Sequence, residues 1–194
     1  MSLPTEAEWS EYYQASIAKP LHPHYENLEP HLPKSGEALE LGCGVGHGVL
    51  HLLNKGFRVT AVDAEEEALA ILRSRLPNGA AATIVRSQFQ ELELAKYDLV
   101  AAHFCLFFLT PAEFNAFWPR LIASIKPGGT LSCQLLGVND EWRDRGYTLL
   151  SRSEVDALLE PFEVLFLEEV ERDGETAVGT KKHWHVFHVV ARKR

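Results

Sequence analysis

Short apolar runs alternate with amphipathic segments along most of the chain. Apolar runs bounded by glycine, proline or charged residues indicate buried strands, and apolar residues at helical spacing indicate helices between them. This alternation predicts a mostly parallel sheet joined by crossover helices. Strands are expected at 38–41, 58–62, 82–86, 97–102 and 130–136, and helices at 46–55, 65–75, 111–124 and 151–159.

The two ends of the chain follow different patterns. Thr5 and Glu8 have the spacing of a capping box, which predicts an amino-terminal helix. At the other end, apolar runs at 162–170 and 184–191 flank the polar turn 173–175, which predicts a hairpin with one antiparallel strand. The expected fold is α/β, with a seven-stranded, mostly parallel sheet and helices on both of its faces.

Length and composition predict one domain. The 194 residues are 46% hydrophobic and 24% charged, enough for a single sizeable core. We expect residues 1–194 to form that domain. Its parts are a helical cap at 1–35, a ligand-binding core at 36–136, and a final helix and hairpin at 137–194.

Four glycines alternate with other residues at 42–48. A strand that ends in glycines and turns into a helix brings backbone N–H groups against a ligand, so this loop indicates a nucleotide site. It is not a dinucleotide loop, because the third glycine would fall at His47 or Val49. It is not a phosphate loop either, because no lysine follows Gly46 or Gly48.

The acid before the glycines narrows the choice of ligand. Glu40 would repel a pyrophosphate but suits a ligand with positive charge, such as a sulfonium with an amino group. Residues 40–46 resemble the first motif of class I S-adenosylmethionine-dependent methyltransferases, Glu/Asp-x-Gly-x-Gly-x-Gly, at every position. Residues 97–100 and 126–129 resemble the approaches to the fourth and fifth strands of that family, so the resemblance spans 38–136.

Segments outside this core look like one branch of the family. Residues 9–13 and 185–193 resemble the small-molecule branch that includes tellurite-resistance and thiopurine methyltransferases. The resemblance implies a three-layer, Rossmann-like fold with S-adenosylmethionine as cofactor. It also implies in-line transfer of a methyl group to a small-molecule acceptor.

Asp63 stands at the end of the second expected strand, where an acid can accept hydrogen bonds from both ribose hydroxyls. It can also serve as the N-cap of the next helix. Gln88 occupies the position where the family often has an acid that binds adenine, and its amide can still bind the base. Phe89 can stack on adenine or fill the core. The expected cofactor-binding residues are Glu40, Gly42, Cys43, Gly44, Gly46, Asp63, Ala64, Gln88, Phe89 and His103.

His103 follows the fourth strand, where the family's chain faces the acceptor. It is the candidate general base, and the alternative is a histidine bonded to nearby backbone. Trp142, Trp184, Tyr12 and Tyr13 are candidates for an aromatic wall over the cofactor, or they fill the core.

Pairs of histidines also invite a metal interpretation. They lie at 22 and 24, 47 and 51, and 183 and 185. Two ligands do not complete a site, so no metal is predicted. Two other functions stay open: an NAD-dependent oxidoreductase, and an S-adenosylmethionine-binding module without turnover.

Charge and cysteine usage restrict partners and compartment. The formal net charge of −8 argues against nucleic acid as a partner. Cys43, Cys105 and Cys133 lack Cys-x-x-Cys spacing, and the first residues show no secretory signal. The apolar run at 99–109 is far shorter than the roughly 20 residues of a membrane helix. We therefore expect a cytoplasmic monomer or homodimer without a membrane partner.

Overall fold

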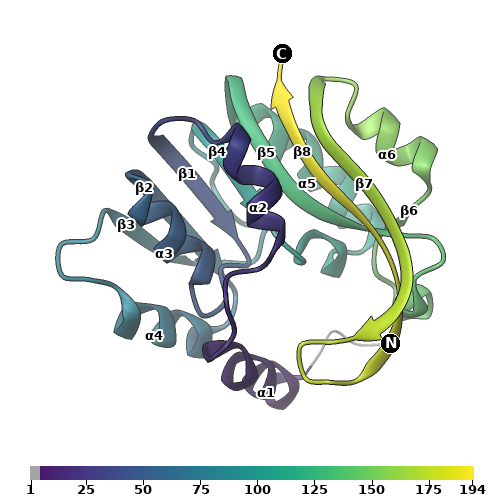
Figure 1. The fold of residues 1–194 in the computed structure, drawn as a ribbon, viewed down its shortest axis with the longest axis horizontal. Helices are drawn as coiled ribbons and strands as arrows, with labels where there is room; N and C mark the ends of the chain where they lie inside the picture. Colours follow the sequence, from purple (N-terminus) through teal and green to yellow (C-terminus); the bar gives the residue numbers. More distant parts are fainter. Residues whose placement is uncertain (1–4) are drawn as a thin grey trace.

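A computed structural model, which describes residues 5–194, contains one mixed sheet with helices on both faces (Figure 1). This confirms the three-layer α/β prediction. The capping box at Thr5 and Glu8 is present and starts the first helix. The α-helices are α1 (Glu6–Ile17), α2 (His24–Leu28), α3 (His47–Asn54), α4 (Glu66–Arg75), α5 (Pro111–Ser124) and α6 (Arg152–Leu158), and the 3-10 helices are η1 (Glu29–His31), η2 (Leu106–Phe108) and η3 (Glu141–Arg145).

The sheet has the strand order β3-β2-β1-β4-β5-β8-β7, and β6 pairs with β5 outside this path. Of the seven strands on this path, only β8 runs in the opposite direction to the others, as the hairpin predicted. The two-residue β6 is an addition to the seven expected strands. The strands are β1 (Gly36–Leu41), β2 (Phe57–Asp63), β3 (Ala82–Arg86), β4 (Tyr97–Ala102), β5 (Ile125–Gly137), β6 (Leu149–Leu150), β7 (Phe162–Glu175) and β8 (Lys181–Lys193).

Alternating strand residues fill two apolar layers, because successive side chains point to opposite faces of a sheet. Ala38 and Leu99 pack with α2, α3 and α4 on one face. Leu39 and Val100 pack with α5 and α6 on the other. The order reverses beside β1, with β2 on one side and β4 on the other, and ligands of open α/β sheets bind at the carboxyl ends of the strands at such a point.

The main differences from the prediction lie at two turns. Residues 126–129 belong to β5, which begins at Ile125 because Tyr97 pairs with that residue before the register shifts. Residues 173–175 belong to β7, which ends at Glu175, and the connection to β8 lies at 176–180. Proline and glycine mark these turns, but strand pairing sets where each ends.

None of the helices in residues 5–194 has the length and apolar character needed to cross a membrane.

Candidate functional site

The glycine loop joins the carboxyl end of β1 to α3. Gly44 has φ +50°, and a Cβ at this position would meet nothing within 4 Å. A Cβ at Gly42 would lie 2.5 Å from the Cβ of Cys105, and one at Gly46 would collide with Leu72. Packing therefore requires glycine at 42 and 46, whereas Gly44 faces open space at the strand-order reversal.

Asp63, the last residue of β2, braces this loop. Its Oδ2 accepts the Gly44 N–H at 2.8 Å, and its Oδ1 accepts the Glu65 N–H at 3.1 Å. The N-cap of α4 is Glu65, so Asp63 supports the helix start from two residues earlier. Burial raises the pKa of Asp63, and these backbone bonds oppose that shift. Each carboxylate oxygen can accept more than one hydrogen bond, so both can still accept from a ligand.

Glu40 is buried under the loop and binds Tyr25 of α2. Its two carboxylate oxygens accept the Tyr25 hydroxyl at 2.7 and 2.9 Å. Burial raises the pKa of Glu40 to about 8, and the bond from Tyr25 opposes that shift. The structure thus uses Glu40 to hold α2 against the sheet. Tyr25 follows a proline-punctuated stretch that gave no signal of this contact.

Two of the expected cofactor-binding residues line the strand ends with their backbone. Cys43 is buried, and its N–H donates to the Val62 carbonyl at 2.9 Å. Burial raises the pKa of the Cys43 thiol, so the sulfur stays protonated. Ala64 is partly exposed, and its carbonyl accepts from Arg86 Nε at 3.1 Å.

Gln88 and Phe89 follow β3 beside the loop. Gln88 is exposed, whereas Phe89 is half-buried and stacks on Phe117 at 5.7 Å between ring centroids. The Phe89 ring also comes within 3.9 Å of the Cβ position of Gly42. Phe89 therefore joins the core and lies near the loop at the same time.

His103 lies directly after β4, between Tyr25 and His24. The ring centroids are 4.5 Å from Tyr25 and 5.2 Å from His24. Its Nε2 lies 2.8 Å from the Ser132 hydroxyl, while its buried Nδ1 has no hydrogen-bond partner. Desolvation, followed by neighbouring imidazoles, holds the pKa of His103 well below its usual value. The ring is therefore neutral near pH 7.

Other unpaired polar atoms gather around His103. Both ring nitrogens of His24 and the Nε2 of Gln134 are buried without a hydrogen-bond partner. The Oε1 of Gln134 accepts the Phe104 N–H at 3.2 Å. Among residues 5–194, Phe104 is the only non-glycine residue with positive φ, at 53°. Unpaired buried groups and unusual backbone cluster at functional sites, so this region is a candidate for substrate contact. The position of Phe104 beside His103 after a strand was the only sequence signal for it.

The expected aromatic wall consists of two groups. Tyr12 and Tyr13 lie on α1, and the buried Tyr13 is near enough to Asp63 to act against the rise in the pKa of that carboxyl, after the backbone N–H groups. Trp142 lies on η3, after β5, and Trp184 lies near the start of β8, with their ring centroids 5.5 Å apart. The sequence indicated these residues, but not their separation.

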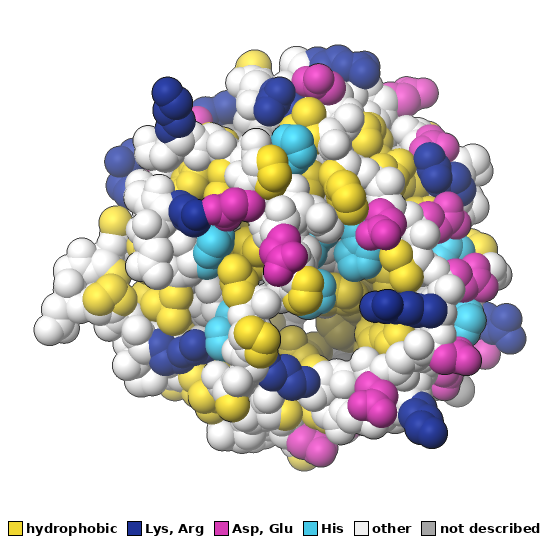
Figure 2. Space-filling view, viewed as in Figure 1, with side chains coloured by type: hydrophobic (Ala, Val, Ile, Leu, Met, Phe, Trp, Pro, Cys, Tyr) yellow, Lys and Arg dark blue, Asp and Glu magenta, His cyan; other side chains and the backbone are white. Residues whose placement is uncertain are grey.

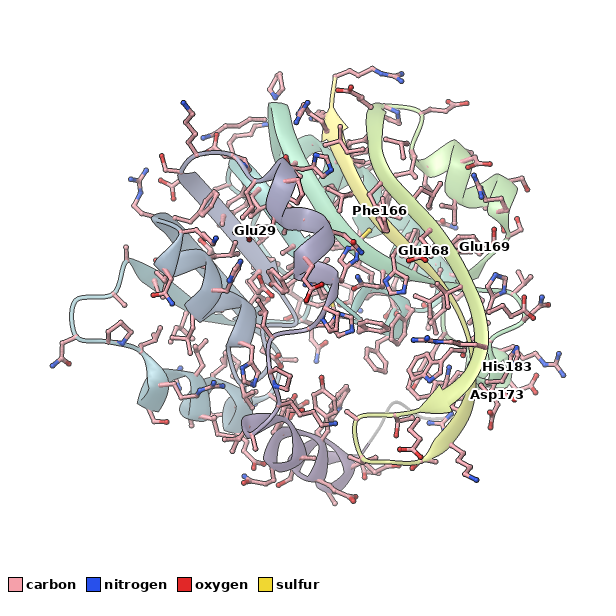
Figure 3. The ribbon with its side chains drawn as sticks, in the orientation of Figure 1. Glu29, Phe166, Glu168, Glu169, Asp173 and His183 are labelled. Atoms are coloured by element: carbon pink, nitrogen blue, oxygen red, sulfur yellow. The ribbon has the colours of Figure 1, made fainter. Side chains whose placement is uncertain are left out.

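The histidine pairs at 47 and 51 and at 183 and 185 are engaged in other contacts. His183 pairs with Asp173 at 2.7 Å, toward the outer edge of the β7–β8 hairpin (Figure 3). His47 Nε2 contacts the Ser16 carbonyl at 2.9 Å, and His51 pairs with Glu29 at 3.1 Å. Within residues 5–194, no three side chains of metal-binding type gather closely enough to hold an ion.

Comparison with known proteins shows which family has a sequence like that of this site. Residues 38–129 match the family described as "Methyltransferase domain". Over these residues the chain is therefore similar to methyltransferase domains. The matched segment contains the glycine loop, Asp63, Gln88, Phe89 and His103.

One relative that the chain matches is a trans-aconitate 2-methyltransferase of Sinorhizobium medicae (strain WSM419). It is 33% identical over 114 residues, which cover 55% of this chain and 40% of that protein. The chain thus spans about two fifths of the length of that relative.

Solved structures extend the likeness to the whole fold. TehB from Haemophilus influenzae superposes with a TM-score of 0.78 at 16% identity, covering 96% of this chain and 68% of that chain. The 1,6-didemethyltoxoflavin-N1-methyltransferase of Burkholderia thailandensis, with bound substrate and S-adenosylhomocysteine, superposes with a TM-score of 0.70. It is 23% identical and covers 100% of this chain and 92% of that chain. At these identities the likeness establishes the shared Rossmann-like fold.

Proposed function

We propose that this chain is an S-adenosylmethionine-dependent methyltransferase that acts on a small-molecule acceptor in the cytoplasm. The observation that carries the proposal is the open space at Gly44, next to the Asp63 carboxylate at the end of the neighbouring strand. Three free, buried cysteines support a reducing compartment. The relative and the solved methyltransferase structures support the reaction class.

The residues around Gly44 fit the cofactor chemically. Asp63 would accept the ribose hydroxyls through its remaining lone pairs, and the side-chain-free Gly44 would let backbone approach the ligand. Gln88 and Phe89 are the candidates for the adenine, by amide hydrogen bonds and by stacking. S-adenosylmethionine supplies an electrophilic methyl group on a sulfonium. The protein's task is to align the acceptor with that methyl and to exclude water.

Calorimetry with S-adenosylmethionine, S-adenosylhomocysteine and NAD tests the cofactor assignment. We expect heat of binding with the two adenosyl compounds and none with NAD. Binding of NAD alone would favour the oxidoreductase alternative. Release of S-adenosylhomocysteine from metabolite pools supplied with S-adenosylmethionine distinguishes an enzyme from a module without turnover.

Asp63→Ala should weaken S-adenosylmethionine binding. The variant loses the ribose acceptor and the brace on the Gly44 N–H, and a lost set of charge-assisted hydrogen bonds costs about 1.5–3 kcal/mol, or roughly 10- to 100-fold in Kd. Calorimetry measures the change. Asp156→Ala on α6 serves as the control for loss of an acid far from the loop. Unchanged affinity in Asp63→Ala would remove Asp63 from the binding site.

His103 is the candidate base for acceptors that must lose a proton. We expect His103→Gln to lower kcat by roughly 10²- to 10⁴-fold while S-adenosylmethionine still binds. Because desolvation lowers the pKa of His103, the wild-type rate should stay level as the pH falls from about 7 to 6. A pH–rate profile with a fall centred near 6.5, or an unaltered kcat in the variant, would exclude this role.

A further inference from the structure

Five aromatic side chains form a continuous row from α1 to the carboxyl end of β4. We call Trp9, Phe108, Trp142, Trp184 and Phe104 the aromatic arc. Successive ring centroids along it lie 5.2, 6.3, 5.5 and 6.0 Å apart. Each of the five side chains is only half-buried. A contiguous row of partly exposed rings is unusual on a protein surface and marks a binding site.

The space-filling view shows a hollow on this side of the molecule. It lies above α1 and inside the curve of β7, with hydrophobic side chains in its walls and histidines along its upper rim (Figure 2). Phe104 links the arc to these histidines, since its ring centroid lies 5.0 Å from His22 and 6.2 Å from His188. The unpaired Gln134 Nε2 lies behind Phe104. The arc therefore adjoins His103, the proposed proton acceptor.

Arg172 adds a positive charge to this wall. It pairs with Trp184 across the β7–β8 hairpin, and directly paired residues of antiparallel strands project from the same face. Arg172 is exposed, and among residues 5–194 its guanidinium has neither a hydrogen bond nor an ion pair. Its charge acts on His188: burial lowers the pKa of that imidazole, Glu168 raises it, and Arg172 lowers it by a smaller amount.

The nearby charges do not neutralise Arg172. Glu168 projects from the same face of β7 beside His188, and Figure 3 shows it on the opposite side of the strand from Glu169. Four residues of strand separate it from Arg172, which is about 13 Å. Lys182 is buried and already paired with Asp140, so its ammonium is not available to a ligand. Arg145 lies at the other end of this group, with its guanidinium 5.3 Å from the Trp142 ring centroid.

We propose that the aromatic arc and Arg172 form the acceptor subsite, and that the acceptor is a flat aromatic molecule carrying a carboxylate. Its ring would pack on Trp184 and Phe104, which favour offset or edge contacts with another ring. Its carboxylate would take a forked pair of hydrogen bonds from Arg172. This inference rests on the proposed function, because it names the class of acceptor for that reaction.

Pairs of acid and amide ligands distinguish the contribution of the aromatic ring to affinity from that of the carboxylate. The protein is first saturated with S-adenosylhomocysteine, whose binding is measured alone. It is then titrated with 4-hydroxybenzoate, indole-3-carboxylate and the amides of both, and with trans-aconitate, an aliphatic tricarboxylate. We expect each aromatic acid to bind at least roughly tenfold more tightly than its amide, the worth of one charge-assisted contact. Trans-aconitate should bind more weakly than either aromatic acid.

Substitutions test which residues produce the expected preference for the acid over its amide. Arg172→Gln should remove the difference between acid and amide, whereas Trp184→Leu should weaken both ligands of a pair alike. Arg192→Gln, at the far end of the same hairpin, makes the same charge change away from the hollow and should leave all affinities unaltered.

Equal binding of acids and amides, an acid preference that survives Arg172→Gln, or tighter binding of trans-aconitate than of the aromatic acids would each overturn the inference. Failure of the protein to bind S-adenosylhomocysteine would instead refute the proposed function. Binding of S-adenosylhomocysteine without binding of either aromatic acid would refute the acceptor class alone.

Discussion

Gly44→Val should abolish detectable binding of S-adenosylmethionine and leave the protein folded. The added side chain enters the open space that a Cβ at this position faces, which is where we place the cofactor. A β-branched residue at φ +50° also costs roughly 1–2 kcal/mol of stability, a cost that most domains survive. Calorimetry measures the lost binding, and circular dichroism measures the retained fold.

Gly79→Val is the matched control for backbone strain. Gly79 also has positive φ, +74°, and a Cβ there also meets nothing within 4 Å, but it lies in the loop between α4 and β3. We expect a similar loss of stability with normal cofactor affinity. If Gly44→Val bound S-adenosylmethionine like the wild type, the cofactor would have to lie away from this loop, and the proposed function would lose its main support.

Lys182→Met should destabilise the fold by about 3–5 kcal/mol, because removing one member of a buried ion pair leaves the other charge without compensation. The Lys182 side chain is 2% exposed and that of Asp140 is 0% exposed. Asp140 would keep its bonds from the backbone N–H groups of Trp142 and His185, which lie at 3.0 and 3.1 Å. Those two bonds do not replace the ammonium.

Urea unfolding gives this free energy directly. The lost ammonium also lies 3.6 Å from the Trp184 ring centroid and 4.3 Å from that of Trp142, so the variant loses cation–π contacts as well. Lys181→Met, at an exposed neighbouring position, is the control and should change stability by less than about 0.5 kcal/mol. A loss below about 1 kcal/mol in Lys182→Met would mean that water reaches this pair.

The sequence predicted the sheet well because its strands are specified locally. The runs at 82–86 and 97–102 match β3 and β4 at both ends, since each is bounded by a change from apolar to polar or turn-forming residues. The alternation of strands and helices then predicted parallel pairing, and the final hairpin predicted the antiparallel strand. Asp63 could be placed beside Gly44 because parallel strands bring their carboxyl ends together.

The acceptor side could not be predicted in this way. The contact between Tyr25 and Glu40, and the row from Trp9 to Phe104, join residues that are far apart in sequence and follow no periodic pattern. The pairing of Arg172 with Trp184 depends on the register of the hairpin. The expected turn at 173–175 would not have given this register.

Phe104 has a left-handed backbone conformation, so the substitutions that would stabilise this position would also remove a ring of the proposed acceptor subsite. Asparagine or glycine tolerates such a conformation at lower energy, so random variation screened for heat resistance alone would tend to replace this phenylalanine. The replacement would remove the ring that links the aromatic arc to the histidines. Attempts to raise the thermal stability of this protein should therefore leave residue 104 unchanged and introduce stabilising substitutions at other positions.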